Sequence, residues 1–198
     1  MARRTRAEME ETRIALLATA RKAFCETGYA AASMDELTAQ AGLTRGALYH
    51  HFGDKQGLLA AVVEQIDGEM DERLKAISDS ADNAWEGFRQ RCQVYLEMAR
   101  EPEIQRIVMR DARAVLGNAS AEAQQPCIAS LQGLLEQLMA QETLVDTDPQ
   151  ALARLIHGSL TEASLWIAEG EDGEARLAKS SAAIDVLLRG LLRRPLPA

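Results

Sequence analysis

Apolar residues recur at intervals of three and four along almost the whole chain of 198 residues. Leu16, Ala20 and Phe24 follow this spacing near the start, and Leu58 and Val62 follow it further on. The interval matches the α-helical turn of about 3.6 residues and places each set on one buried helix face. The chain holds 34 Ala and 25 Leu but only 7 Val and 9 Ile, a mixture that favours helices over strands. We therefore predict an all-α fold.

Local signals divide the periodic segments into about nine helices, three N-terminal and six longer ones. Gly28 stands where a glycine ends a first helix that begins near Ala7. Ser33 followed three residues later by Glu36 has the form of a capping box. Thr44 and Asp54 are the expected N-caps of the next two helices. The last two long helices are expected at about 149–169 and 173–193.

The charge of the chain is unevenly distributed. The formal net charge is −8, which as a total argues against nucleic acid because a polyanion repels an acidic protein. Residues 1–58 carry 8 Lys and Arg against 7 Asp and Glu, a net charge of +1, whereas residues 59–198 carry a net charge of −9. We therefore expect two parts of the chain with different partners.

Several classes of protein are excluded by the sequence. No apolar run approaches the ~18 residues of a membrane span, and the basic segment Met1–Arg6 is followed by acidic residues rather than by the apolar core of a signal peptide. Three widely spaced cysteines, Cys25, Cys92 and Cys127, indicate a reducing compartment and no disulfide framework. We expect a cytoplasmic protein without a membrane partner.

Catalytic and metal-binding patterns are missing as well. His50 and His51 are adjacent, so on a helix they point about 100° apart and cannot share one tetrahedral ion, and His157 is expected to pack in an interface. No glycine-rich phosphate loop, acid–base pair of carboxylates or nucleophile elbow occurs. We expect no metal, no cofactor and no enzymatic activity.

The informative stretch runs from about residue 33 to residue 52. Two helices of about eight residues, joined by a turn that contains Gly42, form a helix-turn-helix pattern. The residues whose spacing directs them to a shared core are Leu37, Ala41, Leu43, Leu48 and Phe52. The spacing alone is equally compatible with an ordinary corner of three helices.

The outward face of the second short helix has chemistry that suits a major groove. Arg45 can pair bidentately with guanine, while the hydroxyls of Thr44 and Tyr49 can reach phosphate oxygens. Gly46 and Ala47 allow close approach to the bases. Lys55, at the start of the next helix, can add a phosphate contact where backbone amides already favour anions. The basic N-terminal residues Arg3, Arg4 and Arg6 are expected near phosphates as well.

This region resembles the DNA-binding domain of the tetracycline-repressor (TetR) family. The likeness covers residues 10 to about 66 almost without gaps, and its core is the pattern Gly-x-x-Tyr-x-His-Phe-x-x-Lys-x-x-Leu from Gly46 to Leu58. The N-terminus is similar to that of the acriflavine-type multidrug-efflux repressors. Thr38 departs from the usual alanine, but its hydroxyl can bond back to its own helix. The segments 106–117 and 162–168 resemble a subset of the family's regulatory domains.

The resemblance implies a DNA-binding domain over residues 1–54 and a larger helical regulatory and dimerisation domain over residues 55–198, with an effector bound in the second. It implies phosphate contacts by Ser33 and Lys55 and a reading helix that presents Thr44, Arg45, Gly46, Ala47, Tyr49, His50 and His51 to a palindromic operator. It also implies a homodimer formed by the last two helices. The expected interface residues are Leu152, Ile156, Leu160, Ala163, Ile184, Leu188 and Leu191. An inducer in the C-terminal domain would spread the two DNA-binding domains and weaken operator binding.

The middle helices supply candidates for an effector site. The apolar and polarisable candidates are Trp85, Phe88, Tyr95, Met98, Met109 and Trp166, which as a group suit an apolar or aromatic ligand. If Arg91, Arg106 or Arg110 were buried, an anionic effector would be favoured instead. The function that the sequence predicts is a ligand-released repressor. The alternative is a dimeric architectural or division-control DNA-binding protein of the same fold that has no small-molecule inducer.

Overall fold

The fold of the described residues is entirely helical. A computed structural model describes residues 6–117, 124–169 and 171–193. Within these ranges there are nine helices if η1 and α6, which run on without a break, are counted as one. The same ranges contain no strand, only an isolated β-bridge between Leu144 and Leu192. The all-α prediction is confirmed.

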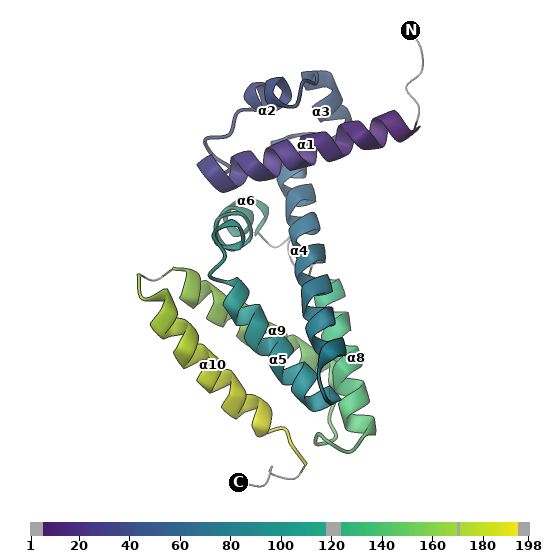
Figure 1. Ribbon diagram of the computed structural model, residues 1–198, viewed down its shortest axis with the longest axis vertical. Helices are drawn as coiled ribbons and strands as arrows, with labels where there is room; N and C mark the ends of the chain where they lie inside the picture. Colours follow the sequence, from purple (N-terminus) through teal and green to yellow (C-terminus); the bar gives the residue numbers. More distant parts are fainter. Residues whose placement is uncertain (1–5, 118–123, 170, 194–198) are drawn as a thin grey trace. The chain divides into compact units, whose positions relative to one another are not determined.

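The helices follow one another along the chain as Figure 1 shows. In order they are α1 (Arg6–Thr27), α2 (Met34–Gln40), α3 (Arg45–Phe52), α4 (Lys55–Ser80), α5 (Ala84–Met98), the π-helix η1 (Ile104–Ala112), α6 (Arg113–Leu116), α8 (Gln125–Ala140), α9 (Pro149–Ala168) and α10 (Gly173–Arg189).

Most of the predicted helix ends are confirmed by backbone geometry. Gly28 has a φ of 85° and donates its N–H to the Phe24 carbonyl at 3.0 Å, as a terminating glycine does. The carboxylate of Asp54 accepts the N–H of Gly57 at 2.7 Å and so caps α4. The prediction of a capping box at Ser33 is wrong. The backbone of Ser33 has the extended N-cap conformation, but its side chain makes no capping hydrogen bond.

The chain divides into two compact units that are not contiguous in sequence. The first comprises Met1–Asp67 and Pro102–Ser120, and the second comprises Gly68–Glu101 and Ala121–Ala198. This division differs from the boundary between residues 54 and 55 that we expected. The start of α4 and the segment that holds η1 belong to the first unit, and the remainder of α4 belongs to the second.

The second unit has a core built from one face each of α5, α8, α9 and α10. Phe88, Leu96, Leu135, Leu138 and Ile167 are completely shielded from solvent within it. Burying side chains of this size contributes about 1.5–3 kcal/mol each relative to leaving them exposed. This periodic apolar face is the one that the sequence predicted for each helix.

The segment at residues 104–112 differs from the expected α-helix. It is a π-helix, and its buried side chains are those of Ile104, Ile107, Met109 and Ala112. Val108, which α-helical spacing would bury together with Ile104, is only half-buried. The wider turn of a π-helix shifts which side chains face inward, and no glycine or proline inside the segment signals the change.

Candidate nucleic-acid interface

The α2–α3 segment forms a tight helix-turn-helix within the first unit. Gly42 adopts a φ of 66°, a left-handed conformation that glycine takes without steric strain. The chain reverses there through a bond from the N–H of Leu43 to the carbonyl of Thr38 at 2.9 Å. Leu37 and Leu48 are buried at 2% and 0% exposure, so both short helices are fixed to the core of this unit.

The departure at Thr38 is accommodated within α2. Its hydroxyl donates to the carbonyl oxygens of Met34 at 3.1 Å and Asp35 at 3.0 Å. A buried hydroxyl therefore has partners on its own helix, as the sequence predicted, and needs no contact elsewhere.

The solvent-facing surface of α3 carries most of the residues expected to read DNA. Thr44, Arg45, Gly46, Tyr49 and His50 are exposed, whereas Ala47 and His51 are half-buried. Thr44 also caps α3 by accepting the N–H of Ala47 at 3.3 Å. The ring of His51 lies between those of His50 and Phe52, at centroid distances of 5.5 and 6.0 Å. Since His51 is packed among rings, it braces the helix more than it presents itself to a groove.

Arg45 is held in place by its neighbours without being buried. Its guanidinium lies 3.1 Å from a carboxylate oxygen of Asp35 and donates to the hydroxyl of Tyr49 at 3.3 Å. It also lies over the Tyr49 ring, 5.6 Å from the centroid. The hydrogen bond to Tyr49 and the charge of Asp35 raise the pKa of Arg45, so the side chain stays cationic at any physiological pH.

Lys55 and Ser33 lie at the edge of the same surface. The Lys55 ammonium stands 4.5 Å from the centroid of the Tyr29 ring and donates to the carbonyl of Ala30 at 3.4 Å. Lys55 opens α4, whose first backbone N–H groups favour an anion. Ser33 is half-buried and precedes α2.

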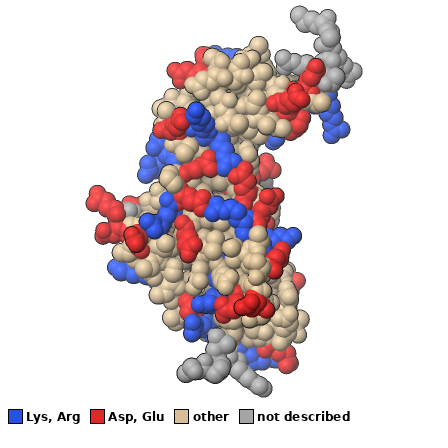
Figure 2. Space-filling model, viewed as in Figure 1, with Lys and Arg blue, Asp and Glu red and all other residues tan. Residues whose placement is uncertain are grey.

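The charge around the reading helix is mixed. Arg6 is exposed at the start of α1, whereas Arg3 and Arg4 lie outside the described residues. Figure 2 shows acidic and basic side chains interspersed on the face of the molecule that it draws. Among the described residues, the cations that belong to α3 and to the start of α4 are Arg45 and Lys55.

Sequence reasoning missed Gly57, which shapes the end of the helix-turn-helix. A Cβ atom at this position would overlap the carbonyl oxygen of Phe52, the last residue of α3. Only glycine therefore lets α4 begin this close to α3. The signal was present in the sequence, as a glycine three residues after the capping Asp54.

The comparisons with known proteins agree with this geometry. A family model described as bacterial regulatory proteins of the tetR family matches residues 16–62. A second, described as the tetracyclin repressor-like C-terminal domain, matches residues 85–191, more than half of the chain. The chain belongs to the TetR family. It is therefore a DNA-binding transcriptional regulator, as the sequence predicted.

Individual TetR-family relatives are similar over different lengths. The HTH-type transcriptional repressor BepR of Brucella suis biovar 1 is 28% identical over 204 residues, which cover 96% of each chain. The HTH-type transcriptional regulator AcrR of Shigella flexneri is 39% identical over 72 residues, 36% of this chain and 34% of AcrR. A solved TetR-family regulator from Pectobacterium atrosepticum is 70% identical and has a TM-score of 0.91, covering 98% of this chain and 100% of that chain.

The structure also joins the DNA-binding helices of this TetR-family chain to η1. The guanidinium of Arg21 on α1 donates two hydrogen bonds of 2.7 Å to Glu103. Arg106 donates to the carbonyl of Thr27 at 2.8 Å, and Asp111 accepts the N–H of Tyr29 at 2.7 Å. All of these residues lie in the first unit. Sequence reasoning missed the three contacts because each joins residues about eighty positions apart.

The candidate effector residues are distributed over both units. Trp85 and Phe88 belong to the core of the second unit, Tyr95 is partly buried against that core, and Met98 is buried in the same unit. Met109 is buried in the first unit, whereas Trp166 is 42% exposed on α9.

The charged candidates for an effector site are divided in the same way. Arg91 is buried at 4% exposure but is already paired with Asp71 at 2.6 Å, so an anionic effector would have to displace a carboxylate. Arg110 is exposed, and Arg106 is engaged at Thr27.

The residues expected at the dimer interface pack inside the second unit instead. Ile156, Leu160, Ile184 and Leu188 are part of its core, and the three remaining candidates, Leu152, Ala163 and Leu191, pack against that core. Large apolar side chains do face solvent on the same two helices. They are Leu155, Trp166, Val186 and Leu187, with exposed fractions of 69%, 42%, 70% and 61%. On the two helices where we expected the dimer interface, the apolar side chains named for it therefore face the core of their own subunit, and other apolar side chains face solvent.

Two kinds of feature are not found among the described residues. Within the described ranges, no helix combines the length and the apolar character needed to cross a bilayer. The same residues hold no group of three or more His, Cys, Asp or Glu side chains placed to bind a metal ion.

Proposed function

We propose that this TetR-family regulator is a cytoplasmic, homodimeric repressor that binds a palindromic operator and is released from it by a small apolar or aromatic ligand. The observation that supports this most directly is the exposed face of α3. A cation fixed by two neighbours, Arg45, stands there beside small residues that permit close approach to bases.

In this proposal α3 enters the major groove. Arg45 donates to a guanine edge, and Thr44 and Tyr49 bind phosphate oxygens beside it. Lys55 contacts the backbone from the start of α4, where its charge adds to the field of the helix N-terminus. Ser33 is assigned to a phosphate at the edge of α2. His50, exposed on α3, is assigned to the groove.

A homodimer gives the two reading helices the symmetry of a palindrome. Two recognition helices occupy successive major grooves when they lie about 34–36 Å apart. Four large apolar side chains that are exposed on α9 and α10 support an association through these helices, because contact with a second subunit would remove them from water.

The ligand is assigned to the second unit. Among the described residues of that unit, Trp85 Nε1, Thr161 Oγ1 and Ser164 Oγ are buried and make no hydrogen bond. Buried polar atoms nearly always have partners, so a ligand that carries a polar group on an apolar body would supply a partner to whichever of these atoms it reaches. A ligand that binds the DNA-incompetent state better shifts the protein toward it, typically by 1–3 kcal/mol, or about 5- to 150-fold.

The test is a mobility-shift titration with the promoter fragments that flank the gene of this chain. Wild-type protein should retain one fragment specifically, as a complex of two subunits or a multiple of two. Arg45→Ala should reduce discrimination against base changes by about 1–3 kcal/mol. Lys22→Ala, which removes an exposed cation on α1, is the matched control and should leave discrimination unchanged. Equal weakening of all DNA sequences by Arg45→Ala would make Arg45 a phosphate contact.

A thermal-shift screen tests the ligand part of the proposal. A compound that raises the melting temperature of the free protein and releases the operator fragment is the expected inducer. An architectural or division-control protein would bind DNA without responding to any compound. Specific DNA binding with no such response would therefore favour that alternative.

A further inference from the structure

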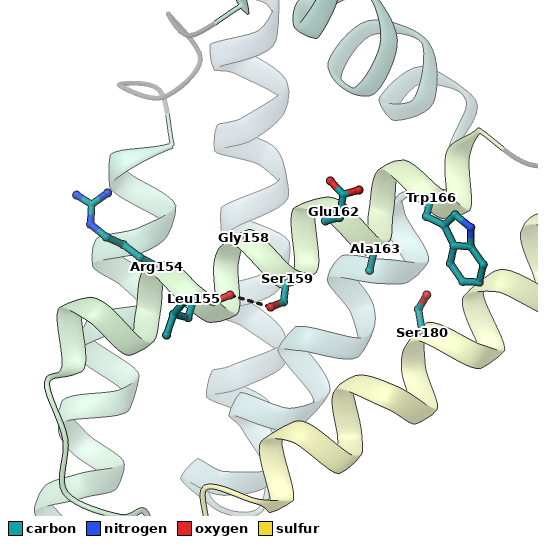
Figure 3. Close-up of a pocket in the computed structure, with 8 residues that line it drawn as sticks. All are labelled: Arg154, Leu155, Gly158, Ser159, Glu162, Ala163, Trp166 and Ser180. Atoms are coloured by element: carbon teal, nitrogen blue, oxygen red, sulfur yellow. Dashed lines mark hydrogen bonds between the residues drawn. The ribbon is translucent and has the colours of Figure 1, made fainter.

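An open groove runs along the outer side of α9 in the second unit. It is lined by Arg154, Leu155, Gly158, Ser159, Glu162, Ala163 and Trp166 of α9 and by Ser180 of α10. Figure 3 shows the α9 residues along successive turns of that helix and Ser180 on α10, with Arg154 and Glu162 directed to the same side of α9.

The charges along this groove are arranged symmetrically about a glycine. Arg154, Gly158 and Glu162 are spaced four residues apart, so they lie along one ridge of the helix, and the two charged residues are about 12 Å apart along its axis. Within the described part of the chain, neither side chain has an ion-pair partner. Arg154 makes only a long hydrogen bond to Gln125, at 3.4 Å.

Gly158 is not required by the fold of its own subunit. It lies in the middle of α9, is exposed, and a Cβ atom added there would meet nothing within 4 Å. A glycine inside a helix costs about 1 kcal/mol relative to alanine. A position that needs no glycine for internal packing but keeps one is suited to the close approach of another backbone.

We propose that α9 crosses the α9 helix of a second copy of this chain at Gly158, antiparallel and about a two-fold axis. In this register Arg154 meets the partner's Glu162, and Glu162 meets the partner's Arg154. The ridge is self-complementary, since rotation about its centre exchanges a positive end with a negative end. The occupant of the groove is thus a second copy, because its charges match those of the groove at both ends.

The surrounding surface favours the same occupant. Leu155 lies one residue from Arg154, and Trp166 is one turn beyond Glu162, so apolar groups flank both ion pairs. Arg176 fixes Trp166, because its guanidinium donates to the Trp166 carbonyl at 2.6 Å and lies 5.1 Å from the ring centroid. Apolar neighbours that exclude water strengthen an ion pair between chains and penalise a mismatched one.

This register rests on the proposed homodimer and adds to it the residues that select the partner. The selection acts through repulsion as much as attraction, because a chain with a different residue at either end of the ridge leaves a charge unpaired or opposed.

The test exchanges the charges and measures the dimer dissociation constant by sedimentation. Arg154→Glu places two acidic residues opposite each other at both ends, and Glu162→Arg places two basic ones. Each single variant should dimerise at least about 30-fold more weakly than wild type. An equimolar mixture of the two single variants should regain a tight heterodimer, and the double variant R154E/E162R should regain a homodimer.

Matched controls carry the same change of charge elsewhere in the second unit. Lys75→Glu and Glu72→Arg reverse exposed charges on α4 and should leave the dissociation constant unchanged. Recovery in the mixture excludes misfolding as the reason for weak single variants. Single variants that dimerise as tightly as wild type, or a mixture that stays dissociated, would overturn the register.

The result is distinguishable from a failure of the proposed function. A wild-type dimer that binds its operator, together with charge-exchange variants that behave like wild type, overturns the register alone. A wild-type monomer without specific DNA binding overturns the register and the proposed function together.

Discussion

At the scale of single residues, two glycines of α4 differ in what a side chain would meet. A Cβ at Gly57 would overlap the Phe52 carbonyl oxygen, whereas one at Gly68 would meet nothing within 4 Å. We predict that Gly57→Ala lowers the free energy of unfolding by about 1–3 kcal/mol because the backbone must move. Gly68→Ala should raise it by about 0.5–1 kcal/mol through helix propensity. Guanidinium chloride unfolding measures both, and a destabilising Gly68→Ala would contradict the expectation.

His157 is the residue whose titration should be visible in stability. It is 7% exposed, beside the Tyr95 ring at a centroid distance of 6.4 Å, and burial lowers its pKa from 6.5. The unfolded chain therefore takes up the proton first as the pH falls. Stability should decline from about pH 6.5 down to the folded-state pKa, by at most about 1.4 kcal/mol per pH unit.

His157→Gln removes this titration, so between pH 7 and pH 5 the free energy of unfolding of the variant should fall less than that of wild type. The buried carboxyl of Asp67, whose pKa is raised to about 6, acts in the opposite direction in both proteins and does not affect the comparison. Unfolding curves across that range measure the slope for both proteins. An unchanged slope in the variant would assign the pH dependence to other groups.

At the scale of elements, the ion pair that Arg21 of α1 forms with Glu103, the residue before η1, should contribute to the free energy of unfolding. The guanidinium of Arg21 and the carboxylate of Glu103 form two charge-assisted hydrogen bonds, and their side chains are only 22% and 32% exposed. Paired hydrogen bonds in partly buried surroundings are stronger than exposed ion pairs.

A double-mutant cycle with Arg21→Met and Glu103→Gln should give a coupling free energy of about 1 kcal/mol. The pair Arg73 and Glu101, with similar hydrogen-bond distances but side chains 51% and 42% exposed, is the comparison and should couple less. Equal coupling in both pairs would show that burial does not strengthen the first.

The elements that could be predicted from the sequence are those specified by neighbouring residues. The end of α1 at Gly28, the turn at Gly42 and the cap at Asp54 each depend on residues within a few positions. The exposed reading face of α3 follows from the same local spacing. Interactions between residues this close in the chain can be predicted from a single sequence.

The features that escaped prediction depend on contacts between distant segments. The bond between Tyr29 and Asp111 joins two parts of the chain separated by 82 positions. The side of α9 that faces solvent was misjudged because both of its sides carry apolar residues, Ile156 on the buried one and Leu155 on the exposed one. Periodicity identifies an apolar face but does not say whether its partner is the same chain or another.

At the scale of the whole molecule, the net charge of −8 makes the placement of each cation decisive. The logarithm of the DNA association constant falls linearly with the logarithm of the salt concentration. Each phosphate that a cation of the protein neutralises makes the slope of this line steeper by about 0.9. If Lys55 contacts a phosphate in both subunits, Lys55→Ala should make that slope shallower by about 2. Affinity measured at several salt concentrations tests this, with Lys22→Ala as the variant that should keep the wild-type slope.

The two-part composition of the first unit has a practical consequence for exchanging parts between regulators. A fragment cut after α3 or after Asp67 would lose Pro102–Ser120, and with it the partners of Arg21, the Thr27 carbonyl and the Tyr29 N–H. A chimaera that joins the first unit to the regulatory domain of another protein therefore needs both of its segments, residues 1–67 and 102–120. The first unit cannot be transferred as one continuous segment, because residues 102–120 belong to it and lie in the sequence between the two segments of the second unit.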